Sequence, residues 1–64
     1  MYANRIKIIR KEKGITLTNL AKLSGLSVGY LCHLEKGTRK NPSIEVMNNI
    51  ARVLNRSIAE VFFE

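Results

Sequence analysis

Hydrophobic residues recur along this chain at the three- and four-residue spacing of a helix. Leu20 and Ala21 follow Leu17 by three and four residues, so the three side chains share one helical face. Gly25 then suits a left-handed or close-packed turn that ends this helix. Thr16 can cap this helix, and Ser27 is a natural N-cap for a second helix, which stops at Gly37. The pattern predicts two short helices joined by a tight turn, which is a helix-turn-helix unit.

The flanking segments predict three further helices. Asn4 can cap a first helix that runs to about Lys13, Ser43 begins a fourth, and Ser57 with Glu60 forms a capping-box pattern that opens a short fifth. The inward positions expected on these helices are Tyr2, Ile6, Ile9 and Arg10, then Ile44, Met47, Ile50, Ala51 and Leu54, and finally Ile58, Val61 and Phe62. No segment alternates as a strand would, so the fold class predicted is all-α, a compact bundle of five short helices.

Length and composition narrow the class of protein. We expect one domain over residues 1–64, with 45% hydrophobic residues to build its core. The apolar runs are far shorter than the roughly 20 residues that cross a bilayer, and no secretory leader is visible at the N-terminus. The single cysteine, Cys32, allows no internal disulfide. We therefore expect a cytoplasmic protein without a membrane partner.

The formal net charge of +6 lies almost entirely in the N-terminal part of the chain. Residues 1–40 carry nine basic and two acidic residues, which gives +7, whereas residues 41–64 carry two basic and three acidic residues, which gives −1. A positive field concentrated on the helix-turn-helix part is expected for a protein that binds a polyanion. A solvated, solubilising surface is the alternative interpretation of the same charges.

An ordered set of residues extends the helix-turn-helix signal over nearly the whole chain. The set comprises Leu20, Ala21, Gly25, Leu26, Leu31, Leu34, Glu35, Gly37, Asn41, Pro42 and Ser43, followed by the ending LNRSIAEVF. In these positions the chain resembles the lambdoid phage repressor and Cro family, the Xre-type helix-turn-helix group of bacteria. The resemblance implies a lambda-repressor-like DNA-binding domain, whose second helix-turn-helix helix enters the major groove.

The chain departs from that family at two positions. Leu17 stands where the family often has a glutamine that bonds DNA, and a leucine side chain cannot make this contact. Ser24 stands where an apolar residue is common, and we expect the neighbouring Leu23 to take over the packing.

Two charged residues fall on the apolar sides of their helices. Arg10 lies on the inward side of the first helix and Glu35 on the inward side of the third. Each alone would be a costly charge at the edge of a core. We expect them to form a partly buried ion pair with a structural role, and the resemblance implies the same partnership.

The opposite side of the third helix is the candidate surface for reading bases. It carries Val28, Gly29, Cys32 and His33, in the early turns of the helix that reach base edges. Val28 could pack on a thymine methyl group, Gly29 would admit close backbone approach, and His33 could donate to guanine acceptors. Val28 as a cover for the core edge and Gly29 as an exposed glycine without a role remain open alternatives.

Phosphate contacts are expected around that surface. The backbone N–H groups at the start of the second helix form an anion site, and polar or basic residues in the recognition helix and on either side of it add donors. The candidates are Thr16, Leu17, Thr18, Ser27, Tyr30, Lys36, Thr38, Arg39, Lys40, Asn41 and Ser43. Arg39 and Lys40 as plain solvated charges are the alternative, and we expect Lys7 and Lys11 to face solvent.

A catalytic or metal-binding role is not indicated. Cys32 and His33 are adjacent, and neighbours on a helix point about 100° apart, so they do not converge on one atom. We expect no enzyme, no metal and no cofactor. Phe63 cannot face inward together with Phe62 on one short helix, so we expect either a homodimer contact or a frayed chain end.

The sequence as a whole predicts a transcriptional regulator that binds double-stranded DNA sequence-specifically. We expect a repressor more than an activator, bound as a two-fold dimer to a near-palindromic operator with half-sites about 34 Å apart. An antitoxin or a restriction-modification controller of the same fold is one alternative. A helical protein-interaction module that does not read DNA is another, against which the charge asymmetry argues.

Overall fold

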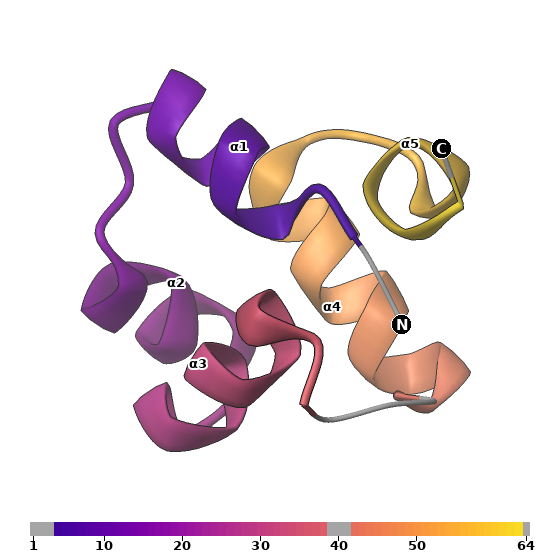
Figure 1. The fold of residues 1–64 in the computed structure, drawn as a ribbon. Helices are drawn as coiled ribbons and strands as arrows, with labels where there is room; N and C mark the ends of the chain where they lie inside the picture. Colours follow the sequence, from indigo (N-terminus) through magenta and orange to yellow (C-terminus); the bar gives the residue numbers. More distant parts are fainter. Residues whose placement is uncertain (1–3, 39–41, 64) are drawn as a thin grey trace.

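The computed structural model describes residues 4–38 and 42–63, and these fold into five α-helices without a strand (Figure 1). In chain order the helices are α1 (Ile6–Glu12), α2 (Leu17–Ser24), α3 (Val28–Lys36), α4 (Ile44–Leu54) and α5 (Ile58–Phe62). The all-α prediction is confirmed. None of the described helices is both long and apolar enough to cross a bilayer.

One hydrophobic core joins the five helices. Helix α4 contacts both α2 and α5, α2 contacts α3, and α1 contacts α5 (Figure 1). The buried residues are Ile6, Ile9, Leu20, Ala21, Leu31, Leu34, Met47, Ile50, Ala51, Leu54, Val61 and Phe62. They recur at helical spacing, which is why the hydrophobic pattern located nearly all of them.

Four helices begin at the hydroxyl caps that the sequence predicts. The side chains of Thr16, Ser27, Ser43 and Ser57 each accept a hydrogen bond from the backbone N–H three residues later. The capping box of α5 is complete, because the Glu60 carboxylate also accepts from the Ser57 backbone N–H at 3.0 Å. These bonds satisfy donors that would otherwise have no partner in the first turn of each helix.

The turn between α2 and α3 depends on a left-handed backbone at Gly25. Its φ of 74° is disfavoured for residues with a Cβ atom, and Gly37 ends α3 in the same way with a φ of 79°. Gly25 therefore has the conformational role that the sequence predicts.

The packing expected of Leu23 is wrong. Leu23 is 62% exposed, whereas Ser24 is buried and donates its hydroxyl proton to the Leu20 carbonyl at 2.6 Å. On α2 the buried stripe runs through Leu20, Ala21 and Ser24, and Leu23 lies about 100° from its centre. A serine fits the stripe because it returns its hydrogen bond to its own helix.

The inward position expected of Ile44 is also wrong. Ile44 is 63% exposed, although Met47, Ile50 and Leu54 on the same helix are buried. It lies in the first turn of α4, about 70° from the centre of the buried stripe. The three-residue spacing to Met47 was therefore insufficient to bring it into the core.

Helix α1 begins slightly later than expected. Asn4 does supply a capping contact, since its Oδ1 accepts from the Ile6 backbone N–H at 3.0 Å, but the helix itself starts at Ile6. Of the inward residues expected on this helix, Tyr2 lies outside the described residues.

Candidate nucleic-acid interface

Helix α3 has one buried and one exposed side. Leu31 and Leu34 are fully buried in the core. The positions of α3 that the sequence assigns to base reading lie on the other side of the helix from these two leucines. The geometry of the candidate interface therefore depends on how firmly the buried side of α3 is held.

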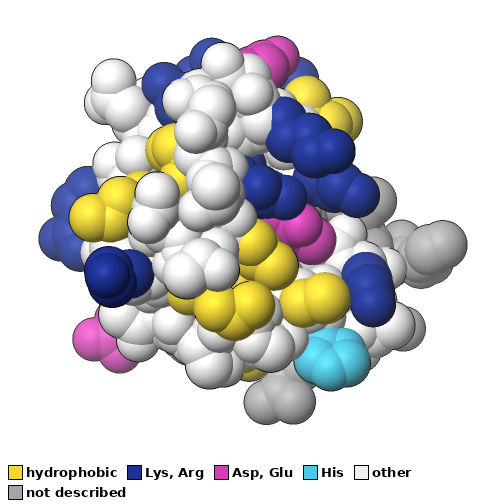
Figure 2. All heavy atoms as spheres, turned by 90° about the vertical axis from the view of Figure 1, so that its left-hand side faces the viewer, with side chains coloured by type: hydrophobic (Ala, Val, Ile, Leu, Met, Phe, Trp, Pro, Cys, Tyr) yellow, Lys and Arg dark blue, Asp and Glu magenta, His cyan; other side chains and the backbone are white. Residues whose placement is uncertain are grey.

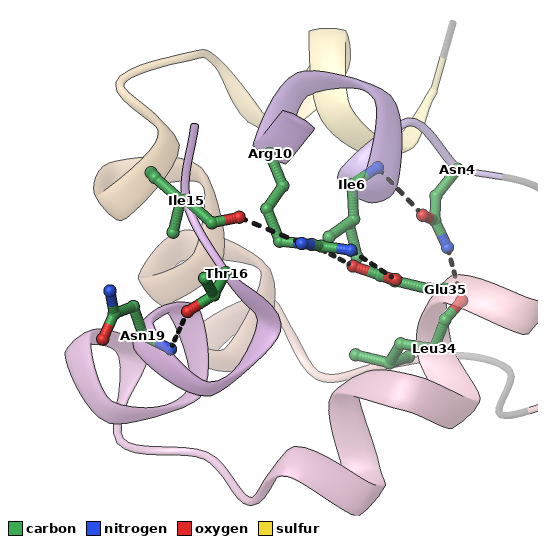
Figure 3. Close-up of polar contacts among 8 residues, drawn as sticks. All are labelled: Asn4, Ile6, Arg10, Ile15, Thr16, Asn19, Leu34 and Glu35. Carbon is green, nitrogen blue, oxygen red and sulfur yellow. Dashed lines mark hydrogen bonds and ion pairs between the residues drawn. The ribbon is translucent and has the colours of Figure 1, made fainter. Parts of the chain in front are cut away.

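An ion pair connects α3 to α1. Arg10 Nε donates to Glu35 Oε2 at 2.8 Å, and the two side chains are only 11% and 8% exposed. A second Arg10 nitrogen donates to the Ile15 carbonyl at 2.9 Å, so the guanidinium also holds the connection between α1 and α2 (Figure 3). The predicted Arg10–Glu35 pair is confirmed.

A second polar contact between α1 and α3 was missed by sequence reasoning. Asn4 Nδ2 donates to the Leu34 carbonyl at 2.7 Å, while its Oδ1 accepts from Ile6 (Figure 3). Asn4 was recognised only as a helix cap, and no spacing rule connects it with a backbone carbonyl thirty residues away. The two contacts hold the C-terminal half of α3 against α1.

The exposed side of α3 brings the candidate base-reading residues together. Val28 is 41% exposed, Gly29 and His33 are exposed, and Cys32 is half-buried. A Cβ atom at Gly29 would meet no protein atom within 4 Å, so the surface is open at this position. Lys36 continues the same side and is exposed.

The face on the left of Figure 1 combines apolar and basic side chains. Figure 2 shows hydrophobic side chains at its centre, Lys and Arg side chains on both sides, and the histidine near its lower edge. Such a surface offers apolar contacts in the middle and positive charge around them. This is the arrangement that suits base edges flanked by phosphates.

The N-termini of α2 and α3 expose hydrogen-bond donors. The first intrahelical bond of α2 runs from the Leu20 N–H to the Thr16 carbonyl, so the N–H groups of Leu17 and Thr18 precede it. The hydroxyl oxygens of Thr16 and Ser27 accept from Asn19 and Tyr30, which leaves their protons for an outside acceptor. Backbone and hydroxyl donors at a helix N-terminus form a site for a phosphate oxygen.

The other candidate phosphate contacts are unevenly placed. Ser43 caps α4 and is exposed, as are Thr18 and Lys36, whereas Tyr30 is half-buried against the core. Leu17 also packs against the core through its side chain, so only its backbone is available. Arg39, Lys40 and Asn41 lie outside the described residues. Lys7 and Lys11 are exposed, as expected.

Within the described residues, no group of three or more His, Cys, Asp or Glu side chains could hold a metal ion. Cys32 is a free thiol on the exposed side of α3.

A model of the family described as "Helix-turn-helix" matches residues 6–61. The chain belongs to the helix-turn-helix family. It is of the Xre/Cro type, so the predicted relationship is confirmed.

Relatives of this helix-turn-helix chain include known regulators. The HTH-type transcriptional regulator SinR of Bacillus subtilis (strain 168) is 40% identical over 58 residues, which cover 91% of this chain and 52% of SinR. The immunity repressor protein of Bacillus phage phi105 is 37% identical over 60 residues, covering 94% of this chain and 41% of the repressor. The chain thus spans about half the length, or less, of these curated relatives.

Solved structures show the same fold. A crystal structure of SinR in complex with DNA matches with a TM-score of 0.81 and 41% identity, over 84% of this chain and 86% of that one. The restriction-modification controller protein C.AhdI from Aeromonas hydrophila matches with a TM-score of 0.82 and 34% identity, over 88% of this chain and 83% of that one.

Proposed function

We propose that residues 1–64 form one DNA-binding domain of a transcriptional regulator, which binds double-stranded DNA sequence-specifically. Helix α3 enters the major groove, with Val28, Gly29, Cys32 and His33 at the base edges. The role is one of binding, without a catalytic step, and it is exercised in the cytoplasm, where bacterial or phage DNA is found. Occupation of promoter DNA makes repression the expected outcome.

One observation carries this proposal most directly. The outer side of α3 is exposed, while Arg10–Glu35 and the bond from Asn4 to the Leu34 carbonyl hold its inner side. Docking into the major groove favours a rigid helix with an exposed outer face. Ordering a mobile helix on binding would cost conformational entropy and weaken the affinity. The likeness to SinR, whose crystal structure contains DNA, supports the same docking.

Hydrogen-bond donors around the base-reading side of α3 make the proposed contacts to the DNA phosphates. Thr16, Leu17 and Thr18 at the start of α2 and Ser27 at the start of α3 present N–H and hydroxyl donors. Further proposed contacts lie on α3, at Tyr30 and Lys36, and after it in the chain, at Arg39, Lys40, Asn41 and Ser43. Thr38 was a sequence candidate as well, but its backbone N–H and its hydroxyl both donate to the His33 carbonyl. The proposed contacts fix the position of α3 along the duplex, whereas the bases determine specificity.

The proposed assembly on DNA is a two-fold dimer on a near-palindromic operator. Phe63 is 67% exposed directly after α5, and an exposed aromatic residue beside a core suits contact with a second copy. The structural likeness to C.AhdI favours a restriction-modification controller as a second candidate within the same class. Both candidates bind DNA through the same face.

Salt dependence of duplex binding tests the proposal. Affinity for a mixed-sequence duplex is measured by fluorescence anisotropy across a series of salt concentrations. We expect log K to fall linearly with log salt, with a slope of about −0.9 for each phosphate neutralised. The double variant Lys7→Ala/Lys11→Ala is the control for general loss of charge, and it should retain most of the slope. A flat plot would favour a protein-interaction module instead.

A further inference from the structure

Thr38 contacts the last turn of α3 at two groups of His33. Its backbone N–H donates to the His33 carbonyl at 3.1 Å. Its hydroxyl oxygen lies 3.2 Å from the same carbonyl oxygen and 2.9 Å from His33 Nδ1. The imidazole at the exposed end of α3 is therefore held by a neighbouring side chain.

The single proton of the Thr38 hydroxyl decides which ring nitrogen of His33 carries a proton. If the hydroxyl donates to the His33 carbonyl, its lone pairs are free to accept from an N–H at Nδ1. If it donates to Nδ1 instead, two oxygen atoms face each other at 3.2 Å with no hydrogen between them. Only the Nδ1–H form makes both contacts favourable.

The other ring nitrogen then has a fixed chemical character. A neutral imidazole carries one proton, so a proton on Nδ1 leaves Nε2 as a hydrogen-bond acceptor. His33 is exposed, and the described residues place no hydrogen-bond partner on Nε2. This nitrogen is therefore available to a ligand on the outer side of α3.

We propose that Thr38 is a positioning residue that makes His33 an acceptor for the exocyclic amino group of adenine or cytosine. In the major groove those amino groups are the donors, whereas guanine presents two acceptors. The proposal rests on the proposed function, and it reverses the donation to guanine expected from the sequence. Specificity at the base pair that His33 contacts therefore depends on Thr38, which follows the recognition helix in the chain.

The tautomer is tested first in the free protein. Long-range ¹H–¹⁵N NMR at about pH 8, where an imidazole in water is neutral, distinguishes a protonated ring nitrogen from an unprotonated one. We expect Nδ1–H in the natural protein and in Thr38→Ser, which keeps the hydroxyl. Thr38→Val removes the hydroxyl but keeps the backbone contact, and it should lose the Nδ1–H form. A proton on Nε2 in the natural protein would overturn the proposal.

The base preference is tested next, with duplexes selected from a random library at the same pH. His33→Ala identifies the base pair that His33 contacts, as the position that loses its preference. There we expect duplexes that keep the exocyclic amino group of the contacted adenine or cytosine to bind about three- to tenfold more tightly than duplexes whose base lacks it, the worth of one hydrogen bond. Thr38→Ser should keep this preference and Thr38→Val should lose it. Equal binding with and without the amino group, or the same preference in both Thr38 variants, would contradict the assignment.

The two measurements separate this inference from the proposed function. A chain that binds no duplex would overturn the DNA-binding role, and the base contact with it, while the NMR result would still decide the tautomer. A chain that binds DNA with Nε2 protonated would retain its function and lose only the role of Thr38.

Discussion

Gly29 is a glycine at a helical position where the protein has room for a larger side chain. It lies near the start of a helix, where glycine is less favourable than alanine, yet it is exposed and nothing in the protein approaches its missing side chain. The protein alone therefore gives no reason for a glycine here. Close approach of the α3 backbone to DNA would supply one.

Replacement of Gly29 by alanine should separate stability from binding. We expect Gly29→Ala to stabilise the fold by about 0.5 kcal/mol, because the unfolded chain loses freedom and the helix gains a better former. The same Cβ should weaken duplex binding by filling space between helix and groove. Thermal unfolding and anisotropy measure the two effects, with the exposed Ile8→Ala as control. Unchanged affinity would mean that the backbone at Gly29 stays clear of DNA.

The Arg10–Glu35 pair illustrates how burial changes the value of an ion pair. Loss of one partner would strand the other at a nearly dry position, which costs about 3 kcal/mol or more. The pair between Arg56 and Glu12 is longer, at 3.6 Å, and its side chains are 34% and 53% exposed, so it should contribute little. The two pairs therefore form a matched comparison within one molecule.

We expect Glu35→Ala to lower the midpoint of thermal unfolding by roughly 10–20 °C, whereas Glu12→Ala lowers it by only a few degrees. Circular dichroism at 222 nm follows both transitions. Equal, small shifts in the two variants would show that the α1–α3 contact does not depend on the buried pair.

The capping box of α5 makes the stability of the fold depend on pH. The Ser57 backbone N–H and then its hydroxyl, both bonded to the Glu60 carboxylate, hold the pKa of that carboxyl below its ordinary value of 4.5. A carboxyl with a depressed pKa in the folded state stabilises the fold above its unfolded pKa. This contribution is lost as the pH falls through the folded value.

The variant Glu60→Gln cannot ionise and should lack this pH dependence. We expect the melting temperature of the natural protein to exceed that of Glu60→Gln by a constant amount above about pH 4.5. As the pH falls below this value, the difference between the two melting temperatures should decrease. Melting curves of both proteins over a pH series measure the difference. Parallel curves would show that the Ser57–Glu60 bonds do not favour the ionised carboxylate.

The elements also show what the sequence could and could not predict. Caps such as Thr16 and Ser57 follow local rules, since donor and acceptor lie three residues apart. The bond from Asn4 to the Leu34 carbonyl and the contact between Thr38 and His33 depend on how the chain folds back in space. Leu23 and Ile44 were misplaced because residue spacing defines a helical face but not the centre of its buried stripe.

The size of the domain constrains how two copies meet on DNA. The described part measures 25 × 22 × 20 Å, while equivalent major-groove positions one helical turn apart are separated by about 34 Å. One copy therefore cannot occupy both half-sites, whereas two copies can, and a contact between them needs side chains that project from the facing surfaces. Phe63 lies at the end of α5, where such a contact would use an already exposed ring.

We expect Phe63→Ser to weaken dimerisation and to reduce cooperativity on a two-half-site duplex, while binding to a single half-site stays unchanged. Sedimentation velocity and gel-shift titration measure the two properties. Ile8→Ser, which alters a comparably exposed apolar residue on α1, is the control and should change neither. Unaltered cooperativity in Phe63→Ser would place the contact between copies elsewhere on the surface.

Enrichment of bound duplexes from a fully random library requires both affinity for DNA and base reading by α3. We expect a near-palindromic motif whose half-sites lie one helical turn apart, about 34 Å, and whose preferred bases change with substitutions at Val28 or His33. A pool that stays random after repeated rounds, or a motif indifferent to those substitutions, would contradict the assignment of α3 as the reading helix.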